Sequence, residues 1–209
     1  MPRRLAVVIF PDFQILDATG PVAAFEIAGR LAPGAYAIEV LAANCGPVAS
    51  SSGVRLLAEP LNEQPYDTLL IAGGNGSRRF DELAPTVDWL RRRARQVRRT
   101  ASICSGAYLL AEAGLLDGRR ATTHWSCSDH FARRYPKVRL EPDRIFVREG
   151  EIWTSAGITA GIDLALGLIE DDLGCDSARR TAQRRVVHQR RAGGQSQFSA
   201  LLEMGGPNG

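Results

Sequence analysis

Short, continuously apolar runs rich in β-branched residues recur along the chain. The clearest are residues 5–10, 36–42 and 68–72, and a fourth run ends at Cys104. Apolar residues at consecutive positions indicate strands that are covered on both faces, as in a parallel sheet. Two further runs within residues 144–155 are joined by Glu149-Gly150, which predicts a hairpin with a two-residue turn.

Segments with a helical spacing of apolar residues separate the strands. The alternation of strands and helices predicts an α/β fold, a three-layer sandwich around a mostly parallel central sheet of the flavodoxin-like type. The apolar helix in the second half of the chain is expected to end at Gly174, and the segment after it is basic. The predicted helices are residues 22–28, 81–98, 125–135, 157–173 and 176–191, together with one that begins just after Cys104 and is closed by residues 114–118.

The residues around Cys104 predict a sharp turn between a strand and a helix. The apolar run ends at Cys104, small residues follow, and a helical pattern begins at once. This is the layout of a nucleophile elbow, in which Ser102 and Gly106 let strand and helix pass closely. The unpaired N–H groups of a helix start are expected to lower the pKa of the thiol. The alternative is a buried cysteine that only packs as a small apolar side chain.

Four chain segments are expected to meet at one edge of the sheet. They carry Asp17 in the loop ahead of the first helix, the Gly73-Gly74 turn, Cys104 and His124. In parallel α/β sheets, ligands bind outside the carboxyl ends of the strands. We therefore predict that these residues, together with Ser105, form one site for a small-molecule ligand or substrate.

Each of these residues has a chemical role and a plainer alternative. Asp17 is expected to be the acid/base partner of the sulfur, with a raised pKa that keeps it protonated, although it would also suit a helix cap. The N–H groups of Gly74 and Ser105 are expected to form an oxyanion-type pocket, although the glycines alone would also suit a tight turn. For His124, a buried histidine with structural hydrogen bonds is favoured over a general base.

Composition limits the classes of function. The 209 residues are 44% hydrophobic and carry a net charge of +3, which suits one domain with a substantial core. No apolar run approaches the roughly 20 residues of a membrane span. With no signal-peptide pattern at the start, we expect a cytoplasmic protein without a membrane partner. The four cysteines and three histidines show no ligand spacing, so neither a metal nor a cofactor is expected.

The arginines in and just after the 81–98 helix are expected to form its solvated face and not a nucleic-acid patch. Cys45 and Cys127 are expected to be packing residues, and His130 and His188 to face solvent. The arginines concerned are Arg91, Arg92, Arg93, Arg95, Arg98 and Arg99.

Several short motifs lie along the chain: Phe10-Pro11, Leu16-Asp17, Gly20-Pro21, Ile71-Ala72-Gly73-Gly74, Ser102-Ile103-Cys104-Ser105-Gly106-Ala107, Leu115-Leu116-Asp117-Gly118, Ala121-Thr122-Thr123-His124-Trp125 and Thr154-Ser155-Ala156-Gly157. Together they resemble the DJ-1/PfpI superfamily, a class I glutamine amidotransferase-like α/β fold. Within it, the chain looks most like the N-terminal domain of GlxA-like regulators of the AraC family and like isocyanide hydratase.

The resemblance implies a reactive Cys104 hydrogen-bonded to Asp17, with His124 near the pocket, and commonly a homodimer. Protease-like and glyoxalase-like members often have a histidine directly after the cysteine, whereas this chain has Ser105. That departure argues against protease or deglycase chemistry. Three functions stay open: a ligand- or oxidation-responsive sensor domain, a hydratase in which Cys104 attacks an isocyanide carbon and Asp17 moves the proton, and an inert scaffold that uses the fold only for dimerisation. Whether the site turns over is left undecided.

The C-terminal residues favour the sensor. Residues 1–175 are expected to form the DJ-1/PfpI-like domain. Residues 176–209 are expected to be a basic helix and tail, and Gly193-Gly194-Gln195-Ser196-Gln197-Phe198 resembles the linker that precedes the helix-turn-helix domain of GlxA-like regulators. Specific DNA contact is expected only through such a domain, which this chain does not contain.

Overall fold

An eight-stranded sheet runs through the centre of the molecule in the computed structural model, which describes residues 1–184, 191, 193–194 and 197. The strand order is β3-β4-β2-β1-β5-β6-β10-β9. All neighbours from β4 to β10 are parallel, and only the edge strands β3 and β9 are antiparallel to theirs. The strands are β1 (Arg3–Val8), β2 (Tyr36–Ala42), β3 (Gly46–Ala49), β4 (Arg55–Pro60), β5 (Thr68–Ile71), β6 (Arg99–Ile103), β9 (Phe146–Glu149) and β10 (Ile152–Ser155), with β7 (Arg120–Ala121) and β8 (Arg139–Leu140) forming a separate pair.

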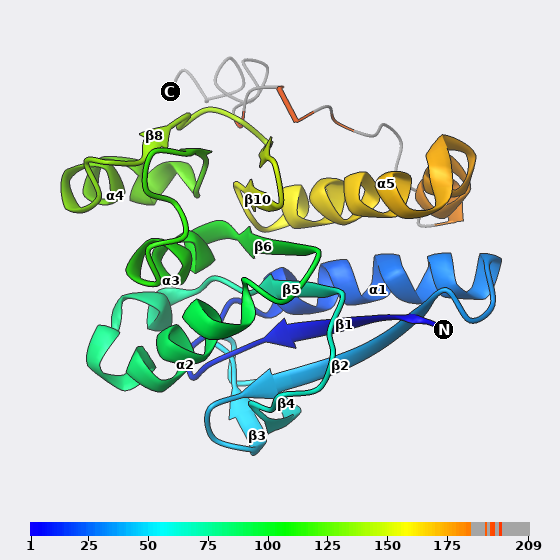
Figure 1. Cartoon of the computed structure of the whole chain (residues 1–209), viewed down its shortest axis with the longest axis horizontal. Helices are drawn as coiled ribbons and strands as arrows, with labels where there is room; N and C mark the ends of the chain where they lie inside the picture. The colour runs from blue at the N-terminus through cyan, green and yellow to red at the C-terminus, as the bar shows by residue number, and fades with distance from the viewer. Residues whose placement is uncertain (185–190, 192, 195–196, 198–209) are drawn as a thin grey trace, which may run out of the picture.

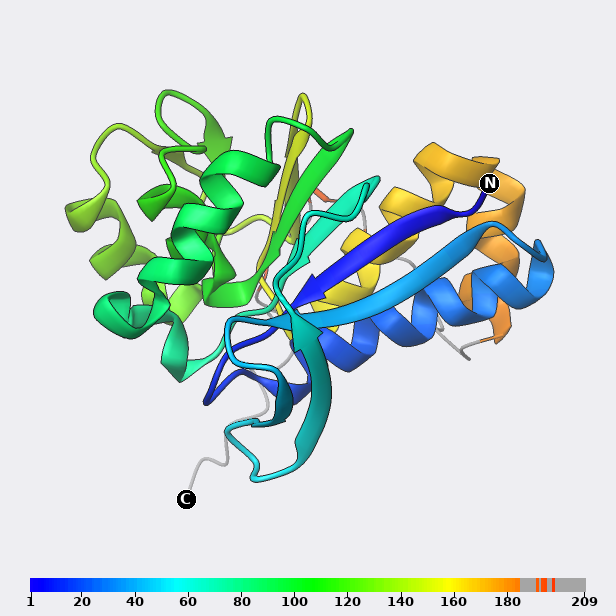
Figure 2. The same cartoon turned by 60° about the horizontal axis from the view of Figure 1, so that its bottom comes forward.

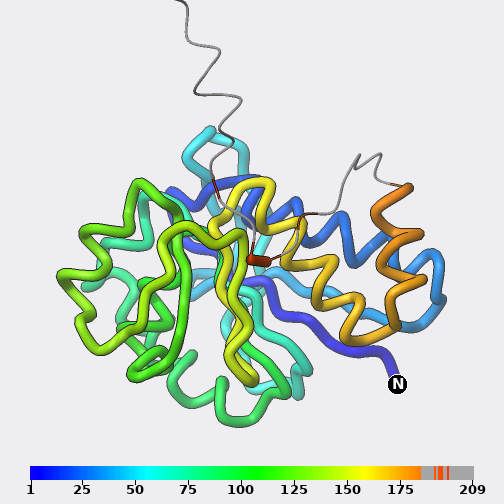
Figure 3. The backbone as a smooth tube through the Cα atoms, turned by 90° about the horizontal axis from the view of Figure 1, so that it is seen from above, coloured from blue at the N-terminus to red at the C-terminus, as the bar shows by residue number. Residues whose placement is uncertain are grey.

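Helices cover both faces of the sheet, which confirms the predicted sandwich (Figure 2). On one face α1 (Ile15–Leu31) and α5 (Thr159–Arg184) run side by side (Figures 1 and 3). They approach closely at Gly20, where a Cβ atom would lie 3.2 Å from Cγ1 of Ile162. The other face is covered by α2 (Phe80–Arg93) and α3 (Ala107–Glu112), and α4 (Ser128–Arg134) packs on α3 through the rings of Phe131 and Tyr108.

The central strands are apolar at successive positions because both of their faces are covered. In β1, β5 and β6 the register places Val7 beside Leu70 and Leu70 beside Ala101, and all three residues are at most 1% exposed. Burying one such large aliphatic side chain contributes about 1.5–3 kcal/mol. The continuous apolar runs in the sequence are therefore the core of the fold.

Several predicted boundaries move. Helix α1 begins at Ile15, so Asp17 lies in its first turn and not in the loop ahead of it. Helix α2 ends at Arg93, short of residue 98. The two-residue hairpin turn is formed by Gly150 and Glu151, one residue later than predicted. Gly174 has a φ of 83° and interrupts α5 where the sequence predicted a break.

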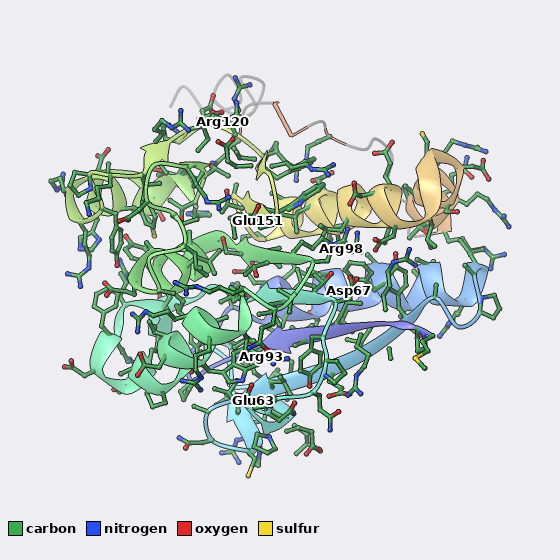
Figure 4. The ribbon with its side chains drawn as sticks, viewed as in Figure 1. Glu63, Asp67, Arg93, Arg98, Arg120 and Glu151 are labelled. Atoms are coloured by element: carbon green, nitrogen blue, oxygen red, sulfur yellow. The ribbon has the colours of Figure 1, made fainter. Side chains whose placement is uncertain are left out.

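The arginine prediction is wrong for two residues. Arg99 is 2% exposed and pairs with Asp171 and Asp172. Arg93 is 5% exposed and pairs with Glu63 (Figure 4). Arg98 is more exposed and holds Asp67 at 2.9 Å (Figure 4).

The packing predictions for the other cysteines and histidines have mixed outcomes. Cys45 is exposed, contrary to the prediction, whereas Cys127 is partly buried. His130 is exposed as expected, and its Nδ1 lies 2.8 Å from the hydroxyl of Tyr108. His188 lies outside the described residues.

In the part of the chain that the structure describes, no helix has the length and apolarity needed to cross a membrane. Within the same residues, no three His, Cys, Asp or Glu side chains gather in a way that would hold a metal ion.

Candidate functional site

Cys104 lies at a strained turn between β6 and a short 3-10 turn, η2 (Cys104–Gly106), which leads into α3. Its φ is 56°, a region that L-residues other than glycine adopt at a cost of about 1–3 kcal/mol. Among the described non-glycine residues, only Asp12 and Ile158 share a positive φ. This strand–turn–helix geometry is the nucleophile elbow that the sequence predicted.

Three glycines make room for the elbow. A Cβ atom at Gly157 would lie 2.1 Å from the Cβ of Cys104, and one at Gly73 would lie 2.7 Å from the same atom. At Gly106 a Cβ would meet the carbonyl oxygen of Ile71 at 2.5 Å. Because real Cβ atoms do not approach this closely, no side chain at these positions is compatible with the observed backbone.

Asp17 lies behind the cysteine and is fully buried. Its Oδ1 accepts a 2.7 Å hydrogen bond from the backbone N–H of Ile158. The helix cap of α1 is Gln14, whose side chain accepts from the N–H of Leu16, so Asp17 does not cap the helix. Oδ2 has no hydrogen bond of good geometry within the described residues, although the Cys104 thiol and the Gly73 N–H lie near enough to favour the charged carboxylate.

Burial dominates the electrostatics of this pair. It raises the pKa of Asp17 from 3.8 to about 6. Burial, followed by the charge of Asp17, also raises the pKa of the Cys104 thiol, with the Ser105 N–H acting in the opposite direction. The expected lowering of the thiol pKa by the helix start is therefore not met in this structure. With both pKa values raised, the pair retains a proton at neutral pH and titrates as a unit.

Ser105 fixes the glycine turn beside the cysteine. Its Oγ accepts from the Gly74 N–H at 2.9 Å and lies 3.0 Å from the Gly74 carbonyl oxygen, to which it donates. Because the Gly74 N–H is already engaged, it is not free to form the oxyanion-type pocket that the sequence suggested.

His124 is held at the rim by its neighbours. The Thr123 hydroxyl donates to the Cys104 carbonyl oxygen at 2.9 Å, which ties the His124 loop to the elbow. The ring Nδ1 accepts from the backbone N–H of Ser126 at 3.3 Å, so the neutral ring carries its hydrogen on Nε2. Burial lowers the pKa of His124, which favours that neutral ring.

A cavity of about 430 Å³ opens over Cys104. It brings together Cys104, Ser105, Gly74 and His124, while Gly73 and Asp17 lie outside its lining. None of the lining residues is acidic, and Arg78, which is exposed, has no carboxylate partner within the described residues. The remaining lining residues are Gln14, Ser51, Asn75, Arg78, Ser126, Cys127 and Ile158.

Sequence reasoning missed these last residues because most of them lie in loops and short turns whose spatial positions no periodicity reveals. One signal was present for Asn75 and Arg78, which follow the glycine turn at the carboxyl end of a buried strand. Residues in such a position belong to the ligand-binding edge of a parallel sheet.

Comparison with known proteins agrees with this geometry. The profile of the DJ-1/PfpI family matches residues 3–171. The chain belongs to this family. It is 36% identical over 183 residues to the isonitrile hydratase of Pseudomonas putida, a match that covers 86% of this chain and 76% of that enzyme.

A regulator is almost equally similar. The HTH-type transcriptional regulator CdhR of Pseudomonas aeruginosa is 35% identical over 195 residues, covering 90% of this chain and 56% of the regulator. The chain thus spans little more than half of that relative. The crystal structure of an AraC family transcriptional regulator from P. putida has a TM-score of 0.79 at 21% identity, covers 88% of this chain and 100% of that chain, and shows the shared fold.

Proposed function

We propose that this chain is the sensor domain of an AraC-type transcription regulator, and that the Cys104 cavity binds a small anionic molecule. The observation that carries the proposal is the match to CdhR, which covers 90% of this chain. That share is larger than residues 1–184 can supply, so the similarity to the regulator continues beyond residue 184. Similarity of this kind is expected where a domain is followed by a segment that links it to a DNA-binding domain.

The chemistry of the cavity supports an anionic ligand. Arg78 supplies a guanidinium without a competing carboxylate, and Nε2 of His124 supplies a neutral donor. Arginine binds carboxylates with paired, charge-assisted hydrogen bonds. A cavity of this volume suits a ligand of metabolite size.

The state of the cysteine supports ligand binding over oxidation sensing. Susceptibility of a thiol to peroxide follows its thiolate character and its exposure. Cys104 has a raised pKa and is only 8% exposed.

The reactive cysteine, a homodimer and a cytoplasmic location remain predictions, as does the domain boundary at residue 175. In this proposal, DNA contact belongs to a helix-turn-helix domain outside these residues.

A thermal-shift titration with a panel of small mono- and dicarboxylates tests the proposal. At about 100 times its Kd, a ligand that binds only the folded state stabilises the protein by about 2.7 kcal/mol. We expect at least one carboxylate to raise the melting temperature, and Arg78→Gln to abolish the shift. Arg55→Gln is the matched control, since Arg55 is exposed and does not line the cavity. An unchanged shift in Arg78→Gln, or no shift with any carboxylate, contradicts the proposal.

A second function, isocyanide hydration, is favoured by the buried Asp17–Cys104 pair and by the 36% identity to the hydratase. In this alternative the Cys104 sulfur adds to the isocyanide carbon while the thiol proton passes through Asp17 to the same carbon, giving a thioimidate. Water then adds to that carbon, and the carbon–sulfur bond breaks. The thiol is regenerated and an N-substituted formamide leaves.

A further inference from the structure

Arg191 is anchored on α5 beside the site. Its backbone N–H donates to Oδ1 of Asp163 at 3.1 Å, and its Nε and Nη2 donate to Oδ2 at 2.9 and 2.7 Å. Nη2 also donates to the hydroxyl of Thr159 at 2.8 Å. Asp163 is 4% exposed and the Arg191 side chain is 29% exposed, so this ion pair is partly sheltered from solvent.

Gln197 is anchored on the other side of the site. Its Oε1 accepts from the backbone N–H of Trp125 at 3.0 Å, and its Nε2 faces the carbonyl oxygens of Thr123 at 3.0 Å and Pro142 at 2.7 Å. Its backbone N–H donates to Oδ1 of Asp143 at 3.0 Å. One amide therefore matches donors and acceptors from several segments, which fixes its orientation.

Glycine makes the contact between these two anchors possible. The carbonyl oxygen of Gly193 accepts from the Phe146 N–H at 3.3 Å, beside the edge strand β9. A Cβ at Gly193 would lie 2.7 Å from the Phe146 carbonyl oxygen. We call Arg191, Gly193, Gly194 and Gln197 together the docked segment.

Residues that hold Arg191 and Gln197 are the sequence neighbours of residues that line the Cys104 cavity. Thr159 follows Ile158, which lines the cavity and donates to Asp17. Thr123 and Trp125 flank His124, which lines the same cavity. A second, smaller hollow of about 150 Å³ is lined by His124, Ile158, Arg191 and Gln197 together, so the docked segment and the cavity share a wall.

We propose that Arg191 and Gln197 are positioning residues that restrain the rim of the Cys104 cavity in the form seen here, in which Cys104 is only 8% exposed, so that docking of this segment and wider access to Cys104 oppose each other. A ligand that needs a wider rim than the docked form has favours release of the docked segment. By reciprocity, release of the segment favours the ligand. The biological meaning of this coupling rests on the proposed sensor function, in which the docked segment belongs to the link between the sensor domain and a DNA-binding domain.

Carboxamidomethylation of Cys104 by iodoacetamide measures the state of the rim without knowledge of the ligand. Couplings between sites typically correspond to about 5- to 150-fold changes. We expect Gln197→Ala and Gln197→Glu to raise the alkylation rate of Cys104 at least about fivefold at pH 7.5. The glutamate variant has the same shape, but at this pH it places a negative oxygen against three carbonyl oxygens, those of Thr123, Pro142 and Arg144. At a lower pH that protonates this glutamate, we expect the ratio of the Cys104 alkylation rate in Gln197→Glu to the wild-type rate at the same pH to fall back toward one. Gln64→Ala, at an exposed glutamine, is the control.

The reverse direction is measured on the full wild-type chain and needs no variant. We expect prior carboxamidomethylation of Cys104 to accelerate tryptic cleavage after Arg191 at least about fivefold. The proposal is overturned if both Gln197 variants alkylate at the wild-type rate, or if the glutamate variant shows no pH-dependent return. It is also overturned if the modified chain is cleaved after Arg191 no faster than the unmodified one. None of these readouts uses a carboxylate ligand. A failure of the proposed function in the thermal-shift titration can therefore be distinguished from a failure of this coupling.

Discussion

The backbone N–H of Ile158 donates a 2.7 Å hydrogen bond to Oδ1 of Asp17, which joins the approach to α5 to the first turn of α1. This bond lies at the centre of the site. Asp17 faces the cysteine on one side, and on the other Ile158 precedes Thr159, which holds Arg191. Ile158 has a φ of 53°, so the bond is made by a backbone that is strained into place.

The raised pKa of Asp17 predicts a specific dependence of stability on pH. Between its ordinary pKa of 3.8 and its folded value of about 6, the folded chain holds this proton more tightly than the unfolded chain does. The free energy of unfolding that Asp17 contributes is therefore fully present below pH 3.8 and is lost as the pH rises through 6. Two pKa units correspond to about 3 kcal/mol. Because the amide that replaces the carboxyl in Asp17→Asn does not titrate, we expect the stability difference between wild type and this variant to shift by about 2–3 kcal/mol toward the variant between pH 4 and pH 7.

Urea unfolding of both proteins at several pH values measures this difference. Asp129→Asn is the control, because Asp129 is exposed. A difference between wild type and Asp17→Asn that stays constant from pH 4 to pH 7 would contradict the assignment of a raised pKa.

The fit between Gly157 and Cys104 predicts that alanine is not tolerated at position 157. The new Cβ would lie 2.1 Å from the Cβ of Cys104, and the backbone has a φ of 87°. Gly118→Ala is a matched control, since Gly118 has a φ of 73° and open space where a Cβ would lie. We expect Gly118→Ala to cost only the backbone strain of about 1–2 kcal/mol. Gly157→Ala is expected to cost at least about 3 kcal/mol, in the range of severe overpacking plus strain. Equal losses of unfolding free energy in the two variants, measured by chemical denaturation, would show that the turn at Cys104 can accommodate a Cβ at position 157 and would contradict this account.

The buried pairing of Arg99 with Asp171 and Asp172 predicts a large penalty for removing the arginine. Arg99→Met keeps the apolar stem but removes the one buried member of the three described arginines that pair with the buried Asp172 carboxylate; the other two are Arg3 and Arg98. Because those two still contact Asp172, we expect a loss at the lower end of the roughly 3–5 kcal/mol that breaking a buried ion pair from one side typically costs. Arg179→Ala removes an exposed pair with Asp176 and is expected to cost less than about 1 kcal/mol. Comparable unfolding free energies for the two variants would refute the structural role of Arg99.

The sequence was sufficient for the fold and for the elbow because both depend on local patterns. Continuous apolar runs predicted the central strands, and the small residues around Cys104 predicted the turn. The burial of Arg93 and Arg99 was not predictable, because their carboxylate partners come from distant segments, as Glu63 and Asp172 show.

The electrostatics and the rim of the site were also beyond the sequence. The helix start next to Cys104 suggested a lowered thiol pKa, but the burial that raises it arises only when the chain packs. Gln197 was part of the linker motif, yet its contacts with Trp125 and Thr123 bridge more than 70 positions of the chain. Such pairing carries no periodic signal.

Turnover of an aryl isocyanide by the purified chain, measured beside Cys104→Ala and Asp17→Asn, tests the central claim most directly. The account predicts that the wild-type protein forms no more than about one equivalent of formamide per chain, because a protonated, buried thiol suits a binding site. Hydration of many equivalents by the wild type, lost in both variants, would contradict the sensor assignment and establish the lyase.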